Sequence, residues 1–124
     1  MDYDYREAMR EDIAQAIAEK EQWFGKTIKE TYEDASEAYD QLYDDFWIND
    51  SVTGNGSGSY TFNTYKAEEH ICHNWELLEE ALYEFGQRDF NPIEKGAEWC
   101  DVIIRCYLLA EILTEVLESV FKEN

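Results

Sequence analysis

The C-terminal segment from Trp99 to Phe121 constrains the fold of this 124-residue chain more than any other stretch. If it is helical, apolar residues recur on one face at steps of three and four, and further apolar residues fall opposite. The first face holds Trp99, Ile103, Cys106, Tyr107, Ala110, Leu113, Leu117 and Phe121, and the second holds Leu108, Ile112 and Val116. A helix apolar on both sides must be covered on more than one side. We therefore expect it to be the centre on which other helices pack, and a homodimer through it is a compatible arrangement.

Three further segments have helical patterns, so we predict a single, mainly α-helical domain over residues 1–124, arranged as a four-helix bundle. The predicted helices cover residues 3–23, 27–47, 64–86 and 93–122. The second has an apolar seam at steps of four and three, formed by Ile28, Tyr32, Ala35, Tyr39, Leu42 and Phe46. Asn91 and Pro92 form a start signal before the last helix.

A small β-hairpin is predicted over about residues 48–63, between the second and third helices. Residues 51–63 carry no charge, and the run from Gly54 to Gly58 is a turn signal. Residues typical of strands flank it: Ile48, Val52 and Thr53 before, and Tyr60, Thr61 and Phe62 after. A lone hairpin is marginal in water, so its aromatic residues should pack on the helices.

The charge of the chain is strongly negative. It has 29 acidic and 10 basic residues, a net charge of −19, yet it contains four Trp, nine Tyr and six Phe. Acidic disordered chains lack such aromatic content, so a folded acidic domain is favoured. This charge repels nucleic acid and anionic membranes, and charged residues interrupt the C-terminal apolar run, so neither is an expected partner. The three cysteines lie in apolar contexts and indicate buried free thiols in a reducing cytoplasm.

An acidic row lies opposite the seam of the second helix and is the predicted partner-binding site. Residues 1–50 carry 15 acids and 5 bases, about half of the net charge. The acids of a helix stepping by three or four lie about 4.5–6 Å apart along its axis, and such a row can occupy a basic groove built for DNA or RNA. The interleaved Tyr43 is an interface anchor if exposed. The site comprises Glu30, Glu33, Glu37, Asp40, Asp44 and Tyr43. The alternative is a solvated helix face.

Two carboxylate pairs form a second candidate site. Glu76 and Glu79 lie on the third helix, and Glu98 and Asp101 open the fourth. Such pairs on neighbouring helices can converge on Mg²⁺, which prefers oxygen ligands. The pattern, with Arg105 after it, resembles the all-α MazG-type nucleoside triphosphate pyrophosphohydrolases. The resemblance implies that the four carboxylates hold Mg²⁺ and that Arg105 lies near phosphate or orients Asp101. The alternative is a set of solvated faces with a surface ion pair between Asp101 and Arg105.

The segments 50–64, 66–69 and 96–109 resemble a family of small acidic proteins from phages and mobile elements of gut bacteria. The similarity runs over most of residues 40–120 and carries no known activity or site residue with it. It implies a phage setting, in which small acidic proteins include inhibitors of host defence, anti-CRISPR proteins among them. The expected function is therefore a non-catalytic, anti-CRISPR-like inhibitor in the cytoplasm of a bacterial host. It would need no cofactor and would block a basic nucleic-acid-binding protein such as a CRISPR effector. The alternative is the Mg²⁺-dependent pyrophosphohydrolase.

Overall fold

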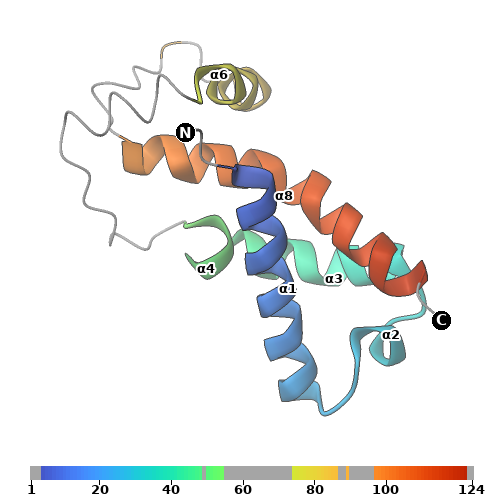
Figure 1. Cartoon of the computed structure of the whole chain (residues 1–124). Helices are drawn as coiled ribbons and strands as arrows, with labels where there is room; N and C mark the ends of the chain where they lie inside the picture. The colour runs from blue at the N-terminus through green and yellow to red at the C-terminus, as the bar shows by residue number, and fades with distance from the viewer. Residues whose placement is uncertain (1–3, 49, 55–73, 87–88, 90–96, 123–124) are drawn as a thin grey trace.

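A computed structural model describes residues 4–48, 50–54, 74–86, 89 and 97–122 of the chain. This part is mainly helical and contains no strand, in agreement with the predicted fold class (Figure 1). Its helices are α1 (Tyr5–Phe24), α2 (Ile28–Thr31), α3 (Ala35–Trp47), α4 (Asp50–Thr53), α6 (Trp75–Glu84) and α8 (Ala97–Lys122). The predicted starts of the last two helices, residues 64–73 and 93–96, lie outside the described residues. None of the described helices is both long and apolar enough to cross a membrane.

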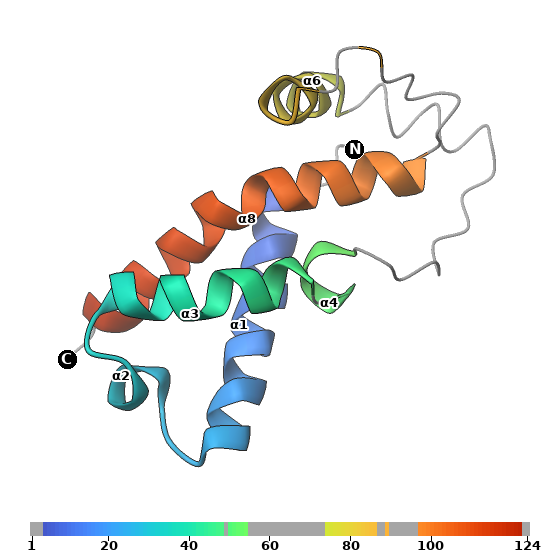
Figure 2. The same ribbon diagram turned by 180° about the vertical axis from the view of Figure 1, so that it is seen from behind.

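The helix α8 is the centre of the fold, as its apolar pattern predicts. It contacts α1, α3, α4 and α6, and both views show α1 and α3 crossing it while α6 lies beside its N-terminal half (Figure 1 and Figure 2). The expected main face is only partly correct, because Trp99 is 56% exposed, whereas Leu108 and Ile112 of the opposite face are fully buried. The helices that pack on several sides of α8 therefore cover both faces of its middle, whereas Trp99 near its start stays exposed and the neighbouring Cys100 is buried.

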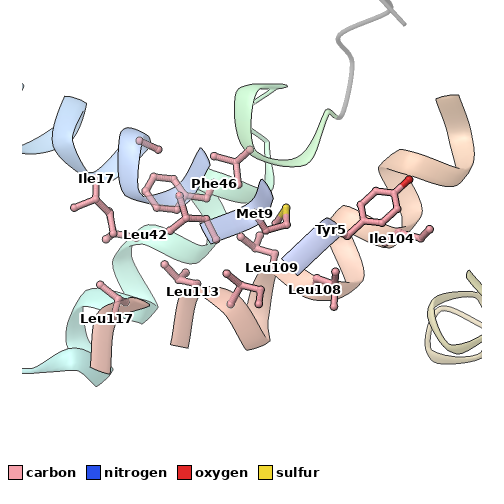
Figure 3. Packing of buried hydrophobic residues seen from close by; sticks show 14 of the residues in the cluster. Tyr5, Met9, Ile17, Leu42, Phe46, Ile104, Leu108, Leu109, Leu113 and Leu117 are labelled. Atoms are coloured by element: carbon pink, nitrogen blue, oxygen red, sulfur yellow. The ribbon is translucent and has the colours of Figure 1, made fainter. Parts of the chain in front are cut away.

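The hydrophobic core lies where α1, α3 and α8 meet (Figure 3). Each helix contributes residues at helical spacing, so that one face of α1 and one face of α3 close on α8. The core includes Tyr5, Met9, Ile13 and Ile17 from α1, Leu42 and Phe46 from α3, and Ile104, Leu108, Leu109, Leu113 and Leu117 from α8. This arrangement leaves the opposite face of α3 directed outwards.

The predicted helix over residues 27–47 is wrong as a continuous element, because the chain forms two helices, α2 and α3. Tyr32 is extended at φ −117° and ψ 149°, and Asp34 caps α3 by accepting a hydrogen bond from the Glu37 N–H at 2.9 Å. Thr27 caps α2 in the same way, with the Glu30 N–H at 3.1 Å. The sequence therefore contains two helix starts, each an N-cap residue followed three positions later by glutamate.

The predicted β-hairpin is also corrected, because residues 50–53 form the one-turn helix α4 instead of a strand. The Thr53 hydroxyl donates a hydrogen bond to the Trp47 carbonyl at 3.0 Å, and the Val52 side chain is fully buried. These tertiary contacts outweigh the β-propensity of Val52 and Thr53, which depends on context. The rest of the predicted hairpin, residues 55–63, lies outside the described residues.

Candidate functional site

The outward face of α3 carries three exposed acids, Glu37, Asp40 and Asp44. They are held there because Leu42 and Phe46, on the opposite face, are buried in the core. The helix is therefore amphipathic, and its polar face consists of carboxylates at steps of three and four residues. We call these three residues the α3 acidic face.

The predicted acidic row is shorter than expected, because Glu30 and Glu33 do not lie on the same helix as the other acids. Glu30 belongs to α2, where its carboxylate accepts a hydrogen bond from the Thr27 hydroxyl at 2.9 Å. Glu33 lies between the two helices, and its N–H donates to the Glu37 carboxylate at 2.8 Å. Glu37 thus also serves to begin α3, which leaves Asp40 and Asp44 as the acids of the face without a capping role.

Four basic residues of the described part pair with acids outside the α3 acidic face. Two exposed pairs join α1 to α8, with 3.4 Å between Arg6 and Glu111 and 3.1 Å between Arg10 and Glu115. Lys20 pairs with Asp45, and Arg105 pairs with Asp12. Within the described residues no ion pair involves the α3 acidic face. Residues 28–47 hold seven acids and one base, a net charge of −6, so this part of the surface is strongly negative.

A line of aromatic rings runs along α3 beside the acidic face. The Tyr39 and Tyr43 rings stack with their centroids 5.3 Å apart, and the Trp47 ring lies 5.9 Å from that of Tyr43. Phe85, directly after α6, meets Trp47 edge-on with 6.1 Å between the ring centroids. Burial raises the pKa of Tyr39, and the charge of Asp40 adds to this effect. Tyr43, the predicted anchor, is half-buried, and its ring contacts both Tyr39 and Trp47.

The predicted metal ligands are placed on different sides of the described structure. Glu76 and Glu79 are exposed on α6, whereas Asp101 is 9% exposed and accepts a hydrogen bond from the Tyr5 hydroxyl of α1. The described residues contain no group of three Asp, Glu, His or Cys side chains that could hold a metal ion. The side chain of Glu98 lies outside the described residues, so the four-carboxylate site stays a prediction.

Arg105 is a buried connector between three helices. It is 6% exposed, its Nε donates to the Val52 carbonyl of α4 at 2.8 Å, and its guanidinium pairs with Asp12 of α1. The alternative prediction of a surface pair between Asp101 and Arg105 is therefore wrong, because both residues are buried and each has a partner on α1. Sequence reasoning missed Tyr5 and Asp12, which lie 96 and 93 positions away from these partners.

Cys100 and Cys106 are buried free thiols, as predicted, and the third cysteine, Cys72, lies outside the described residues. Burial raises the pKa of Cys100 to about 12, with a contribution from the Asp101 charge, and burial raises the pKa of Cys106 to about 11. Nucleophilic and metal-binding cysteines need an accessible thiolate. These two thiols stay protonated near neutral pH and are suited to packing.

Comparisons with protein-family models, with curated proteins and with solved structures found no match to this chain. The resemblances to phage proteins and to MazG-type enzymes therefore rest on the segments quoted for them. The α3 acidic face is the candidate site that the described geometry supports best.

Proposed function

We propose that this protein is a non-catalytic, anti-CRISPR-like inhibitor that occupies a basic nucleic-acid-binding site on a host nuclease complex. The observation that supports the proposal is the α3 acidic face, which is exposed and makes no ion pair within the described residues. The net charge of −19 adds a long-range attraction to a basic partner. The resemblance to phage proteins supplies the setting in a bacterial host.

The spacing of the acidic face suits the proposed competition. Along a helix axis, Glu37 and Asp40 are about 4.5 Å apart and Asp40 and Asp44 are about 6 Å apart. A DNA strand carries one phosphate per about 3.4 Å of axis, so three carboxylates cover about the same length as three phosphate steps. A rigid helix presents these charges already ordered, which reduces the conformational entropy lost on binding.

The proposal is tested with purified guide-RNA-loaded CRISPR effector complexes, in assays of target-DNA binding. The key variant is Asp40→Asn combined with Asp44→Asn, because neither residue caps a helix. We expect the wild-type protein to compete with DNA for one such complex, and the double variant to inhibit about tenfold less, in line with the loss of two interfacial charges.

The matched control is Glu76→Gln combined with Glu79→Gln, which removes the same charge from exposed positions of α6. Its inhibition should be within about twofold of that of the wild type, because the loss of two negative charges weakens only the long-range attraction to the basic partner. Equal inhibition by the Asp40, Asp44 variant and the control would contradict a role for the α3 acidic face. Failure to bind any DNA- or RNA-binding complex would overturn the proposed function.

The MazG-like alternative gains no support from the described contacts. Asp101 accepts a hydrogen bond from Tyr5. Arg105 pairs with Asp12 and donates a hydrogen bond to the Val52 carbonyl. Neither side chain is therefore directed to Glu76 and Glu79, which are exposed. Pyrophosphate release from nucleoside triphosphates in the presence of Mg²⁺ remains its direct test, with Glu98→Gln as the variant that should abolish turnover.

A further inference from the structure

An open pocket of about 410 Å³ lies between the start of α3 and the last turns of α8. Both views show these two helix ends side by side (Figure 1 and Figure 2). The pocket is lined by Ala35, Ser36, Tyr39, Thr114, Leu117 and Glu118. Its size is within the range of about 300–1,000 Å³ that is typical of ligand pockets.

The lining combines an apolar floor with one charged group. Leu117 is buried, and the ring of Tyr39 is half-buried against the core. The Thr114 hydroxyl already donates to the Ala110 carbonyl at 2.7 Å. Glu118 is exposed and forms no ion pair within the described residues, and this holds also for Lys122 one turn later on α8 as its partner. Among the described residues no lysine or arginine lines the pocket, and the one formal charge in this lining is negative.

We infer that this pocket receives an arginine side chain from the basic partner, with its methylene groups on Leu117, its guanidinium over the Tyr39 ring and its charge facing Glu118. Arginine buries its stem on apolar surface while its head stays polar, and it stacks on aromatic faces while pairing with carboxylates. Lysine lacks the planar group for such stacking. The assignment rests on charge complementarity, because the chain offers a carboxylate here and carries a net charge of −19.

The inference deepens the proposed function and rests on it for the nature of the partner. Tyr39 lines the pocket, and the next residue, Asp40, belongs to the α3 acidic face. A basic groove that binds this face would therefore reach the pocket with a neighbouring side chain. Arginine is also frequent among the residues that dominate binding energy at interfaces.

The test is a titration of the isotope-labelled protein with N-acetyl-arginine amide at low salt, followed by backbone amide chemical shifts. We expect saturable shifts at Ala35, Ser36, Thr114 and Leu117. N-acetyl-citrulline amide, which has nearly the same shape without the charge, and N-acetyl-norleucine amide, which is apolar, should shift these amides far less.

Two variants examine the two parts of the pocket. Glu118→Gln should weaken arginine amide binding by about two- to fivefold, as expected for an exposed ion pair. Thr114→Met fills the pocket without changing the charge and should weaken binding at least as much. Glu84→Gln is the matched control, because Glu84 is an exposed acid of α6, which lies beside the other end of α8. It should leave the affinity unchanged.

Equal shifts with norleucine amide would overturn the inference in favour of an apolar ligand. Shifts of the same amides on raising the protein concentration without any probe would overturn it in favour of a second copy of the chain. Equal weakening by Glu118→Gln and Glu84→Gln would show attraction to the whole acidic surface instead of this pocket. The titration needs no partner protein, so its failure is distinct from a failure to inhibit an effector complex.

Discussion

At the scale of single residues, the decisive feature is a set of polar side chains that connect α8 to its neighbours. Asp101 and Arg105 lie one turn apart on α8, and each has a partner on α1. A buried arginine without hydrogen-bond acceptors would strongly destabilise the fold. Arg105 has such acceptors in the Asp12 carboxylate and the Val52 carbonyl, so it holds α1 and α4 against α8.

Replacing Arg105 with leucine should lower the free energy of unfolding by about 2–3 kcal/mol. The Val52 carbonyl would lose its charged donor, whereas Asp12, whose side chain is 39% exposed, would still be hydrated. Urea denaturation measures the change. Arg6→Leu is the control, since Arg6 pairs with Glu111 on the surface, and it should lower stability by less than about 1 kcal/mol. Equal losses would contradict the role of Arg105 as a buried connector.

The two buried thiols predict a loss of stability in alkaline solution. Burial raises the pKa of Cys100 to about 12 and of Cys106 to about 11, from a value of 9.0. The unfolded chain releases these protons at a lower pH than the folded chain does. The stabilisation is therefore fully present below pH 9.0 and is lost as the pH rises through about 11 to 12.

Urea denaturation between pH 8 and pH 11 would measure this dependence. The double variant Cys100→Ala, Cys106→Ala should be less stable at pH 8, because truncation leaves small cavities. Its unfolding free energy should nevertheless fall less steeply with pH than that of the wild type. Parallel curves for the two proteins would show that the thiols do not contribute to the pH dependence.

At the scale of the elements, the division of residues 27–47 into α2 and α3 determines which acids form one surface. Asp34 is exposed, and within the predicted helix over residues 27–47 it would be another solvated acid. In the structure its carboxylate accepts a hydrogen bond from the Glu37 N–H and so caps the start of α3. Asp34 is therefore a structural acid, whereas Asp40, one and a half turns later, belongs to the candidate binding face.

Asp34→Ala should lower the free energy of unfolding by about 1 kcal/mol, because the first turn of α3 loses its cap. Asp34→Asn retains a capping side chain and should be close to the wild type. Asp40→Ala serves as the control, as it removes the same charge from α3 without removing a cap. Thermal denaturation compares the three variants, and equal melting temperatures for Asp34→Ala and Asp40→Ala would contradict the capping role.

At the scale of the whole molecule, a chain with 29 acids and 10 bases folds around a single hydrophobic core cluster. The described ion pairs on the surface are few and largely solvent-exposed, and such pairs contribute little. Repulsion among the remaining carboxylates opposes the compact state. A homodimer through α8 stays a prediction, and Trp99, which is 56% exposed, is a residue that it would bury.

Raising NaCl from 20 to 500 mM should therefore raise the melting temperature by about 5 °C, equivalent to about 1 kcal/mol for a domain of this size. Chloride is preferred to sulfate, which strengthens apolar burial in all proteins. The Asp40→Asn, Asp44→Asn variant should show a smaller increase, because it has less repulsion to screen. A melting temperature that falls with NaCl would mean that the ion pairs outweigh the repulsion.

The helical class and the central position of α8 could be predicted because they depend on local information. A period of three to four residues and apolar residues on both faces of one segment are visible without its neighbours. The outward position of Asp40 and Asp44 also follows from the seam of Leu42 and Phe46. The break before Asp34 was visible in principle, since an N-cap residue followed by Glu37 is a start signal within the sequence.

A mainly helical, strongly acidic fold built around α8 could thus be predicted, because periodicity and charge are properties of short segments. The helix at residues 50–53 and the contacts of Asp101 and Arg105 with α1 instead arise from the packing of the helices. These outcomes depend on Tyr5 and Asp12, which are more than 90 positions away in the chain, and on the burial of Val52. No local pattern specifies such partners, since they are brought together only when the helices pack.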